Sequence, residues 1–267
     1  MTELMALTTP QYLLLMNVFN LSIALFGAAS LVFILLRRHV SHNYSMAVSL
    51  MAGVTAMACY HYFRIFANWQ AAFTQQGAEY LPSGVAFSYA YRYADWLGTV
   101  PLLISAVILV LDLGRQKTTS LVARLGVSAA LMVALGYVGE AEHVNMAARA
   151  AWGAASTLPF LYILSVLWGE VGQALRFESA RVQTLFASLR GLLVASWCVY
   201  PVIYALPLLG LGGPEHLPWV QVANSAADLL AKVGTGFLLV SIAREKTEED
   251  RLSGHVGVAT PLVTAAD

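Results

Sequence analysis

Long apolar stretches, separated by short polar segments, follow one another along almost the whole chain. They lie at about 11–36, 44–67, 86–111, 121–139, 146–171, 187–210 and 217–243. Each contains the roughly 20 mostly apolar residues that a helix needs to cross the hydrocarbon layer of a bilayer. The pattern predicts an all-α membrane protein, a seven-transmembrane helix bundle that occupies residues 1–243. We expect residues 244–267 to form a short, flexible cytoplasmic tail.

The composition supports a membrane protein and excludes two other classes. Apolar residues make up 58% of the 267 residues and charged residues 11%, against about 45–50% and 25% in typical soluble proteins. The mean hydropathy is +0.67 and the formal net charge is zero. So few charges could not cover the surface of a soluble enzyme of this size, and no basic run is present that could bind nucleic acid. Cys59 and Cys198 both lie in apolar stretches, which argues against a disulfide scaffold.

The basic residues cluster at alternate ends of the predicted spans. Those that follow the first, third, fifth and seventh spans are Arg37, Arg38, Arg115, Lys117, Arg124, Arg176, Arg181, Arg244, Lys246 and Arg251. The opposite segments 68–85 and 211–216 contain no Lys or Arg. Because basic segments stay in the cytoplasm, we expect an extracellular or periplasmic N-terminus and a cytoplasmic C-terminus. Glu140, Glu142 and His143 on the outer side could hold or release protons, but a solvated loop is the expected interpretation.

Four ionisable residues lie inside predicted spans, where a charge is costly and is therefore a candidate for function. Arg92 and Asp95 are three residues apart in the third span, and Asp228 and Lys232 are four apart in the seventh. Each pair therefore shares one face of its helix. The two acids and two bases have no net charge, as expected of a buried cluster. These four residues alone are compatible with a purely structural ion network as well as with a functional site.

The residues around these charges resemble those of microbial (type 1) rhodopsins, and the resemblance covers all the predicted spans. The third span reads RYADWLGTVPLL from Arg92, and the seventh reads DLLAKVG from Asp228. The resemblance implies that Lys232 binds all-trans-retinal covalently as a Schiff base. It implies that Asp95 is the primary counterion and proton acceptor and that Asp228 is the second counterion. Arg92 would balance the two acids, and the hydroxyl of Thr99 would bond to the acceptor.

The resemblance also implies the walls of a retinal slot. They would be Trp96, Leu103, Gly153, Ser156, Thr157, Phe160, Trp197, Tyr200 and Tyr204. Aromatic residues at helical spacing are usually core, but the lysine and the two acids favour a cofactor slot here. Leu103 stands where a leucine or a glutamine tunes the colour of proteorhodopsins, and leucine implies green absorption. Gly153 stands where many relatives have a bulky aromatic residue. It would either open a window for a carotenoid antenna, as in xanthorhodopsin-like proteins, or allow close helix packing.

The second span points to one branch of this family. It contains YHYFR from Tyr60 to Arg64, which resembles the Trp-His-Tyr segment of proteorhodopsins and xanthorhodopsins. The match implies that His61 hydrogen-bonds Asp95 and that Tyr62 lies near Asp228. A lone histidine in an apolar span is otherwise more often a contact between helices.

One position departs from the proton pumps of this branch. These proteins have a carboxylic acid fourteen residues after the arginine, where it reprotonates the Schiff base, and this chain has Ala106 there, preceded by Ser105. No acid in a neighbouring span is an obvious replacement, because Asp112 lies nearly two turns further along, at the membrane edge. The departure puts efficient pumping in doubt but leaves the photochemistry intact.

Two functions from different classes therefore remain open. The first is a light-driven outward proton pump that is reprotonated through water from the cytoplasm. The second is a photosensory rhodopsin that signals through a transducer, which the short tail without an evident output domain disfavours. An inward proton pump ranks third, because such proteins typically have proline at the position of Asp228. Sodium and chloride pumps fit less well, because their residues at the positions of Asp95 and Thr99 differ from those of this chain. We expect a multi-pass protein of a bacterial inner membrane, surrounded by lipid, without a metal, and assembled as a homo-oligomer, a trimer or pentamer.

Overall fold

The protein is almost entirely helical in the computed structural model, which describes residues 4–211 and 213–254. The α-helices are α1 (Thr9–Leu36), α2 (His42–Ala72), α3 (Ala90–Leu109), α4 (Arg115–Ala141), α5 (Met146–Trp168), α6 (Glu170–Leu175), α7 (Ala180–Trp197), α8 (Val199–Ala205), α9 (Leu217–Leu229) and α10 (Thr235–Leu252). Three short 3-10 helices are η1 (Arg37–His39), η2 (Pro207–Leu209) and η3 (Pro214–His216), and η4 (Leu230–Gly234) is a π-helical turn.

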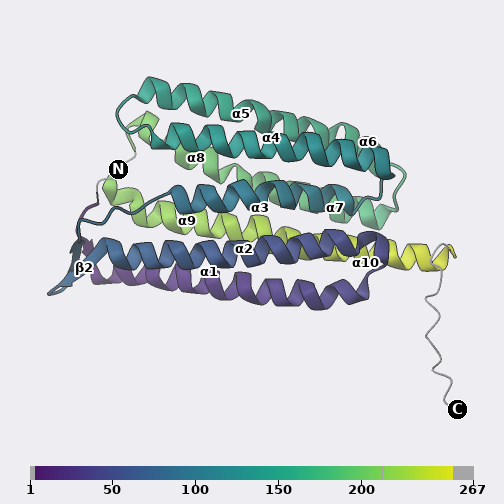
Figure 1. Cartoon of the computed structure of the whole chain (residues 1–267), viewed down its shortest axis with the longest axis horizontal. Coiled ribbons are helices and arrows are strands. Elements are labelled where there is room, and N and C mark those ends of the chain that lie inside the picture. Colours follow the sequence, from purple (N-terminus) through teal and green to yellow (C-terminus); the bar gives the residue numbers. More distant parts are fainter. Residues whose placement is uncertain (1–3, 212, 255–267) are drawn as a thin grey trace, which may run out of the picture.

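Seven helical segments of the described residues are long and apolar enough to cross a membrane, which confirms the predicted seven-transmembrane bundle. They lie side by side along the long axis of the molecule (Figure 1). We call the end where α1 begins the N-terminal end of the bundle and the end where α10 finishes the C-terminal end. Large apolar side chains such as Leu31, Leu131 and Leu158 are exposed on the outside, as expected of a surface that faces lipid.

Two of the spans are interrupted near Lys232 and its surroundings. The sixth span breaks between α7 and α8 at Cys198, because Pro201 has no N–H to donate to the carbonyl of Trp197, four residues earlier. The seventh span changes from α9 through the π-helical turn η4 into α10, and Lys232 lies within that turn. Such π-helical turns are frequently found at functional sites. The break at Cys198 and the π-helical turn η4 both lie beside the interior region around Lys232.

The predicted boundaries differ from the structure at the end of the seventh span. Helix α10 continues to Leu252. The expectation of a flexible tail from residue 244 is therefore wrong for residues 244–252. The reason is that this part of the helix is packed: Lys246 and Thr247 are buried, and the Lys246 ammonium donates to the Leu111 carbonyl at 3.0 Å. The rest of the predicted tail, residues 255–267, lies outside the described residues.

A small sheet at the N-terminal end was not predicted. The strands β1 (Leu7–Thr8), β2 (Phe73–Gln76) and β3 (Glu79–Pro82) are antiparallel in the order β1-β3-β2. A two-residue turn joins β2 to β3, and Gly77 adopts a φ of 63° there, which glycine tolerates without steric cost. The strands are too short for hydropathy to reveal, and they tie the chain before α1 to the connection between α2 and α3.

Candidate functional site

The four predicted ionisable residues meet in the middle of the bundle. The Lys232 Nζ donates to Asp95 Oδ2 at 2.7 Å and to Asp228 Oδ1 at 2.6 Å. The Arg92 Nη1 donates to Asp228 Oδ2 at 3.1 Å. All four side chains are at most 3% exposed. Buried charges persist in a protein only when they are paired, and here α3, α9 and η4 supply two cations for two anions.

The two carboxylates have very different surroundings. Among the described residues, five side chains donate hydrogen bonds to the Asp228 carboxylate, whereas one, Lys232, donates to the Asp95 carboxylate. The donors to Asp228 are Tyr62 (2.8 Å), Arg92 (3.1 Å), Trp96 (2.9 Å), Tyr200 (2.9 Å) and Lys232 (2.6 Å). The Asp95 Oδ1 is buried and has no hydrogen-bond partner among the described residues. Because donors stabilise the ionised form of a carboxylate, the surroundings stabilise ionised Asp228 more than ionised Asp95.

The neighbours of these acids agree only partly with the sequence predictions. Tyr62 lies against Asp228, as predicted. The Thr99 hydroxyl bonds Asp95 as predicted, and the acceptor atom is the backbone carbonyl, at 2.8 Å, not the carboxylate. His61 makes no direct hydrogen bond with Asp95 in the described part of the chain. Its Nδ1 and the Asp95 Oδ1 are both buried without a partner, although the two groups interact electrostatically.

Two further polar residues that were not predicted from the sequence hold Arg92. The Gln221 Oε1 accepts from Arg92 Nε at 3.2 Å and Nη2 at 2.9 Å, and the Ser225 Oγ accepts at 3.3 Å. Both lie on α9, seven and three residues before Asp228. That spacing places them on the face of Asp228, so helical periodicity could have found them.

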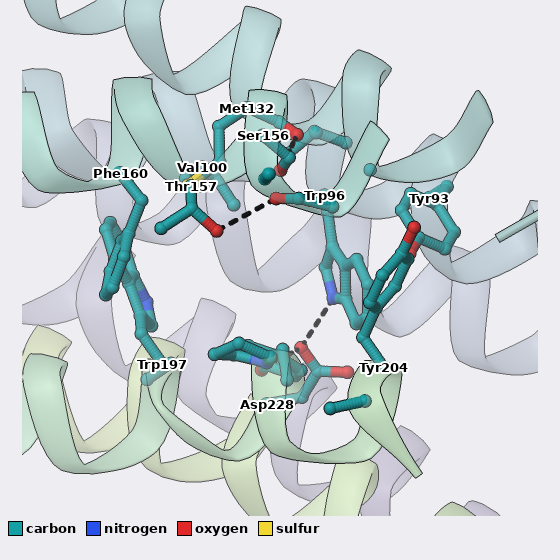
Figure 2. A pocket seen from close by; sticks show the side chains of 18 of the residues that line it. Tyr93, Trp96, Val100, Met132, Ser156, Thr157, Phe160, Trp197, Tyr204 and Asp228 are labelled. Carbon is teal, nitrogen blue, oxygen red and sulfur yellow. Dashed lines mark hydrogen bonds between the residues drawn. The ribbon is translucent and has the colours of Figure 1, made fainter. Parts of the chain in front are cut away.

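A cavity of about 310 Å³ adjoins Lys232. Its walls include all nine predicted slot residues, from Trp96 and Leu103 on α3 to Trp197, Tyr200 and Tyr204 on α7 and α8. Figure 2 shows Phe160 and Trp197 on one side of the cavity and Tyr93 and Tyr204 on the opposite side. The volume is at the lower end of the range for small-molecule sites, about 300–1,000 Å³. An apolar, aromatic-walled slot with one amine in its wall fits retinal.

Gly153 allows close packing of Tyr204 in the wall of this cavity. A Cβ added to Gly153 would lie 2.5 Å from Tyr204 Cε1, and Gly139 faces the hydroxyl of the same ring. The tyrosine therefore occupies the space that side chains on α4 and α5 would fill. Close packing, one of the two interpretations of Gly153, is present in the structure.

A second buried ion pair lies at the N-terminal end of the bundle. The Arg149 Nη2 contacts Glu140 Oε2 at 2.7 Å, and the side chains are 3% and 18% exposed. The expectation that Glu140 lies in a solvated loop is therefore wrong. Arg149 was not predicted from the sequence, because an arginine near the end of an apolar span usually extends to the membrane interface.

Comparison with known proteins agrees with this geometry. A family model described as bacteriorhodopsin-like protein matches residues 14–246. A bacteriorhodopsin from a Haloterrigena species is 33% identical over 187 residues, which covers 70% of this chain and 71% of that protein. A green-light absorbing proteorhodopsin from a gamma-proteobacterium is 29% identical over 219 residues, 81% of both chains.

Solved structures are similar over nearly the whole chain. The crystallographic structure of xanthorhodopsin, a light-driven ion pump with dual chromophore, has a TM-score of 0.89 and 41% sequence identity, covering 93% of this chain and 99% of that one. A thermophilic rhodopsin has the same TM-score and coverage at 43% identity.

Proposed function

This chain belongs to the bacteriorhodopsin-like protein family, in the branch of the proteorhodopsins and xanthorhodopsins, and from that premise we propose that it is a light-driven outward proton pump. Microbial rhodopsins are light-driven ion pumps or photoreceptors and not enzymes. One observation carries the proposal: the Lys232 nitrogen lies 2.7 Å from Asp95 and 2.6 Å from Asp228, and only Asp228 is saturated by other donors.

The chain's own residues can direct a proton away from Lys232. All-trans-retinal, bound covalently to the Lys232 nitrogen, would supply light absorption and an isomerising double bond. The proton on that nitrogen goes to Asp95, because one oxygen of this carboxylate is free of donors. Asp228 stays ionised, because Tyr62, Arg92 and the other donors hold it. Trp96 and Tyr200 line the slot and also donate hydrogen bonds to Asp228. The walls of the slot are therefore connected directly to the second counterion.

We propose that the return proton crosses the C-terminal half of the bundle through water. Ala106 is fully buried in an apolar cluster with Val107 and Leu239. Among the described residues Asp95 and Asp228 are the only acids that are 1% exposed. Glu178, on this side, is 18% exposed and is held by Lys246 at 2.6 Å, so no free buried carboxylate among the described residues supports an internal donor. The basic clusters support a cytoplasmic position for this half, and with that orientation transport would be outward.

The protein is a multi-pass membrane protein in contact with lipid. We propose a bacterial inner membrane, a homo-oligomeric trimer or pentamer, and green absorption, which Leu103 in the cavity wall supports. The kinship with xanthorhodopsin, which has a dual chromophore, favours a carotenoid antenna beside Gly153. Because Tyr204 fills the space above Gly153, substitution there would also disturb the slot. A carotenoid band in the action spectrum of the unmodified protein is the cleaner test.

Proton flux in cell suspensions given all-trans-retinal tests the proposed function. Illumination should acidify the medium, and a protonophore should abolish the change. Alkalinisation would indicate an inward pump, and a coloured protein that causes no change would indicate a photosensor with a transducer partner. The variant Lys232→Ala should be colourless, and colour in that variant would refute the retinal linkage.

A further inference from the structure

A second cavity, of about 300 Å³, lies at the N-terminal end of the bundle. It shares four aromatic wall residues with the cavity beside Lys232: Tyr93, Trp96, Tyr200 and Tyr204. The charged and titratable groups in its wall differ from those of the first cavity and are Glu140, Glu142, His143, Arg149 and His216. The function proposed above uses none of them.

A chain of hydrogen bonds leads from the counterions toward this second cavity. Arg92, which contacts Asp228, donates to Gln221 Oε1 at 2.9 Å. The Gln221 Nε2 in turn donates to the Tyr89 hydroxyl at 2.9 Å, and Tyr89 lines the second cavity together with Glu140. Burial raises the pKa of Tyr89, which immediately precedes α3, so its phenol stays neutral. It keeps a hydrogen to donate into the cavity while it accepts from Gln221.

Glu140 is the carboxylate best placed to take a proton in this cavity. Its Oε2 pairs with Arg149 Nη2 at 2.7 Å, and a carboxylate whose cationic partner moves away gains affinity for a proton. Burial and the charge of Arg149 lower the pKa of His143, which makes that imidazole a weaker competitor for a proton. The carboxylate of Glu142 has no ion pair among the described residues, and only its backbone oxygen is near Arg149, at 3.5 Å.

Tyr204 couples this ion pair to the wall of the first cavity. Its hydroxyl donates to the Arg149 carbonyl at 2.6 Å, and its own carbonyl accepts from Arg149 Nη2 at 3.3 Å. The guanidinium lies over the ring, 4.4 Å from its centroid. The same ring packs against Gly153 beside the slot. A movement of Tyr204 in response to its slot neighbours would therefore move Arg149 relative to Glu140.

We propose that Glu140 accepts the transported proton in the second cavity and passes it to the outer solution. This inference rests on the proposed function of an outward proton pump. The carboxylate gains one proton, which neutralises it and weakens its pairing with Arg149, and it then loses that proton to water. The side chain ends the cycle ionised, and no other reactant is needed.

Flash photolysis with a soluble pH-indicator dye tests the assignment on the retinal-reconstituted full chain. Glu140→Gln keeps an oxygen that can accept from Arg149 but cannot hold a proton. We expect the proton to appear in solution about 100-fold later than in the wild type, the low end of the effect of a positioned acid or base. The loss of the proton from Lys232, read from the visible spectrum, should keep its wild-type rate. Glu142→Gln, a matched neutralisation two residues away, should leave both rates unchanged.

The outcomes separate this inference from the proposed function. A coloured wild type that releases no proton would refute the pump itself. Wild-type release that Glu140→Gln leaves unchanged in time would overturn only the role of Glu140. Should Glu140→Gln fail to take up retinal, time-resolved infrared spectra of the wild type and of Glu140→Asp decide. A transient protonated-carboxyl band that shifts with Glu140→Asp supports the assignment, and a band that does not shift contradicts it.

Discussion

Asp95 and Asp228 illustrate how much the immediate surroundings of one side chain decide. Both are fully buried acids within hydrogen-bonding distance of the same ammonium group. Five donors hold the carboxylate of Asp228, and one holds that of Asp95. The sequence places both acids near Lys232, but only the three-dimensional arrangement shows which of them has a free oxygen.

The first prediction concerns the proton acceptor. Asp95→Asn should still bind retinal, because Asp228 remains as counterion, but it should lose outward proton flux by about 100-fold or more. Flux from illuminated cells and the visible spectrum of the purified variant are the measurements. Normal flux in a coloured Asp95→Asn variant would exclude Asp95 as the acceptor.

The second prediction concerns Tyr62, whose hydroxyl accepts from Arg92 at 2.9 Å and donates to Asp228 at 2.8 Å. Tyr62→Phe leaves two buried charged groups each short of one hydrogen bond, which should lower the free energy of unfolding by about 1–3 kcal/mol. Thermal loss of colour measures the change. Tyr60→Phe is the matched control, because Tyr60 is 58% exposed. Equal stability of the two variants would contradict the role of the Tyr62 hydroxyl.

Single residues also show where prediction from the sequence ended. The lysine, both acids and Tyr62 follow from the resemblance, and the structure brings them together. Thr99 does bond Asp95, but through the backbone carbonyl, and the direct bond predicted between His61 and Asp95 is not found among the described residues. A side-chain rotamer and a distance between helices decide such bonds. The pair Glu140–Arg149 joins the end of α4 to the start of α5, and no spacing within one helix reveals it.

At the scale of whole elements, the hydropathy pattern located every span but misjudged the end of the last one. Helix α10 is kept helical beyond residue 244 by contacts to other elements. The Lys246 Nζ donates to Glu178 Oε1 at 2.6 Å as well as to the Leu111 carbonyl, and the Thr247 Oγ1 accepts from the Ser41 amide at 2.9 Å. The charges that make this segment look like a tail are the groups that anchor it.

The third prediction tests that anchoring. Lys246→Met removes one partner of a buried ion pair and should destabilise the C-terminal end of the bundle by about 3–5 kcal/mol. Hydrogen exchange of the amides in 244–252 should become faster. Glu245→Gln is the matched control, because the neighbouring pair of Glu245 with Arg181 is exposed and 3.8 Å long. Unchanged exchange in Lys246→Met would show that the helix end holds without this contact.

At the scale of the whole molecule, the fourth prediction concerns proton uptake across the apolar layer around Ala106. If protons reach Lys232 from bulk water, its reprotonation should slow as the pH rises, because the proton concentration falls. Flash photolysis across roughly pH 6 to 9, a range that spans ordinary working conditions, measures the late decay. Ala106→Asp supplies a local donor and should make that decay nearly independent of pH. A pH-independent decay in the wild type would reveal a donor that the described residues do not show.

The global architecture was the part most accessible from the sequence. Long apolar runs must become helices in a bilayer, since backbone polar groups have no other partners there, and this constraint alone fixes the number of spans. The small sheet at the N-terminal end escapes it, because its strands lie outside the apolar runs and depend on contacts between distant segments such as Leu7 and Tyr80.

The two halves of the bundle also differ electrically. Polar groups and cavities lead from the counterions to the N-terminal end, whereas Ala106, Val107 and Leu239 belong to an apolar layer on the other side. A voltage falls mainly across the least polarisable layer, and moving one charge through 100 mV costs about 2.3 kcal/mol. The resting potential of an energised cell would therefore act chiefly on proton uptake. A high membrane potential would therefore slow the reprotonation of Lys232 and have little effect on the light-driven proton transfer to Asp95.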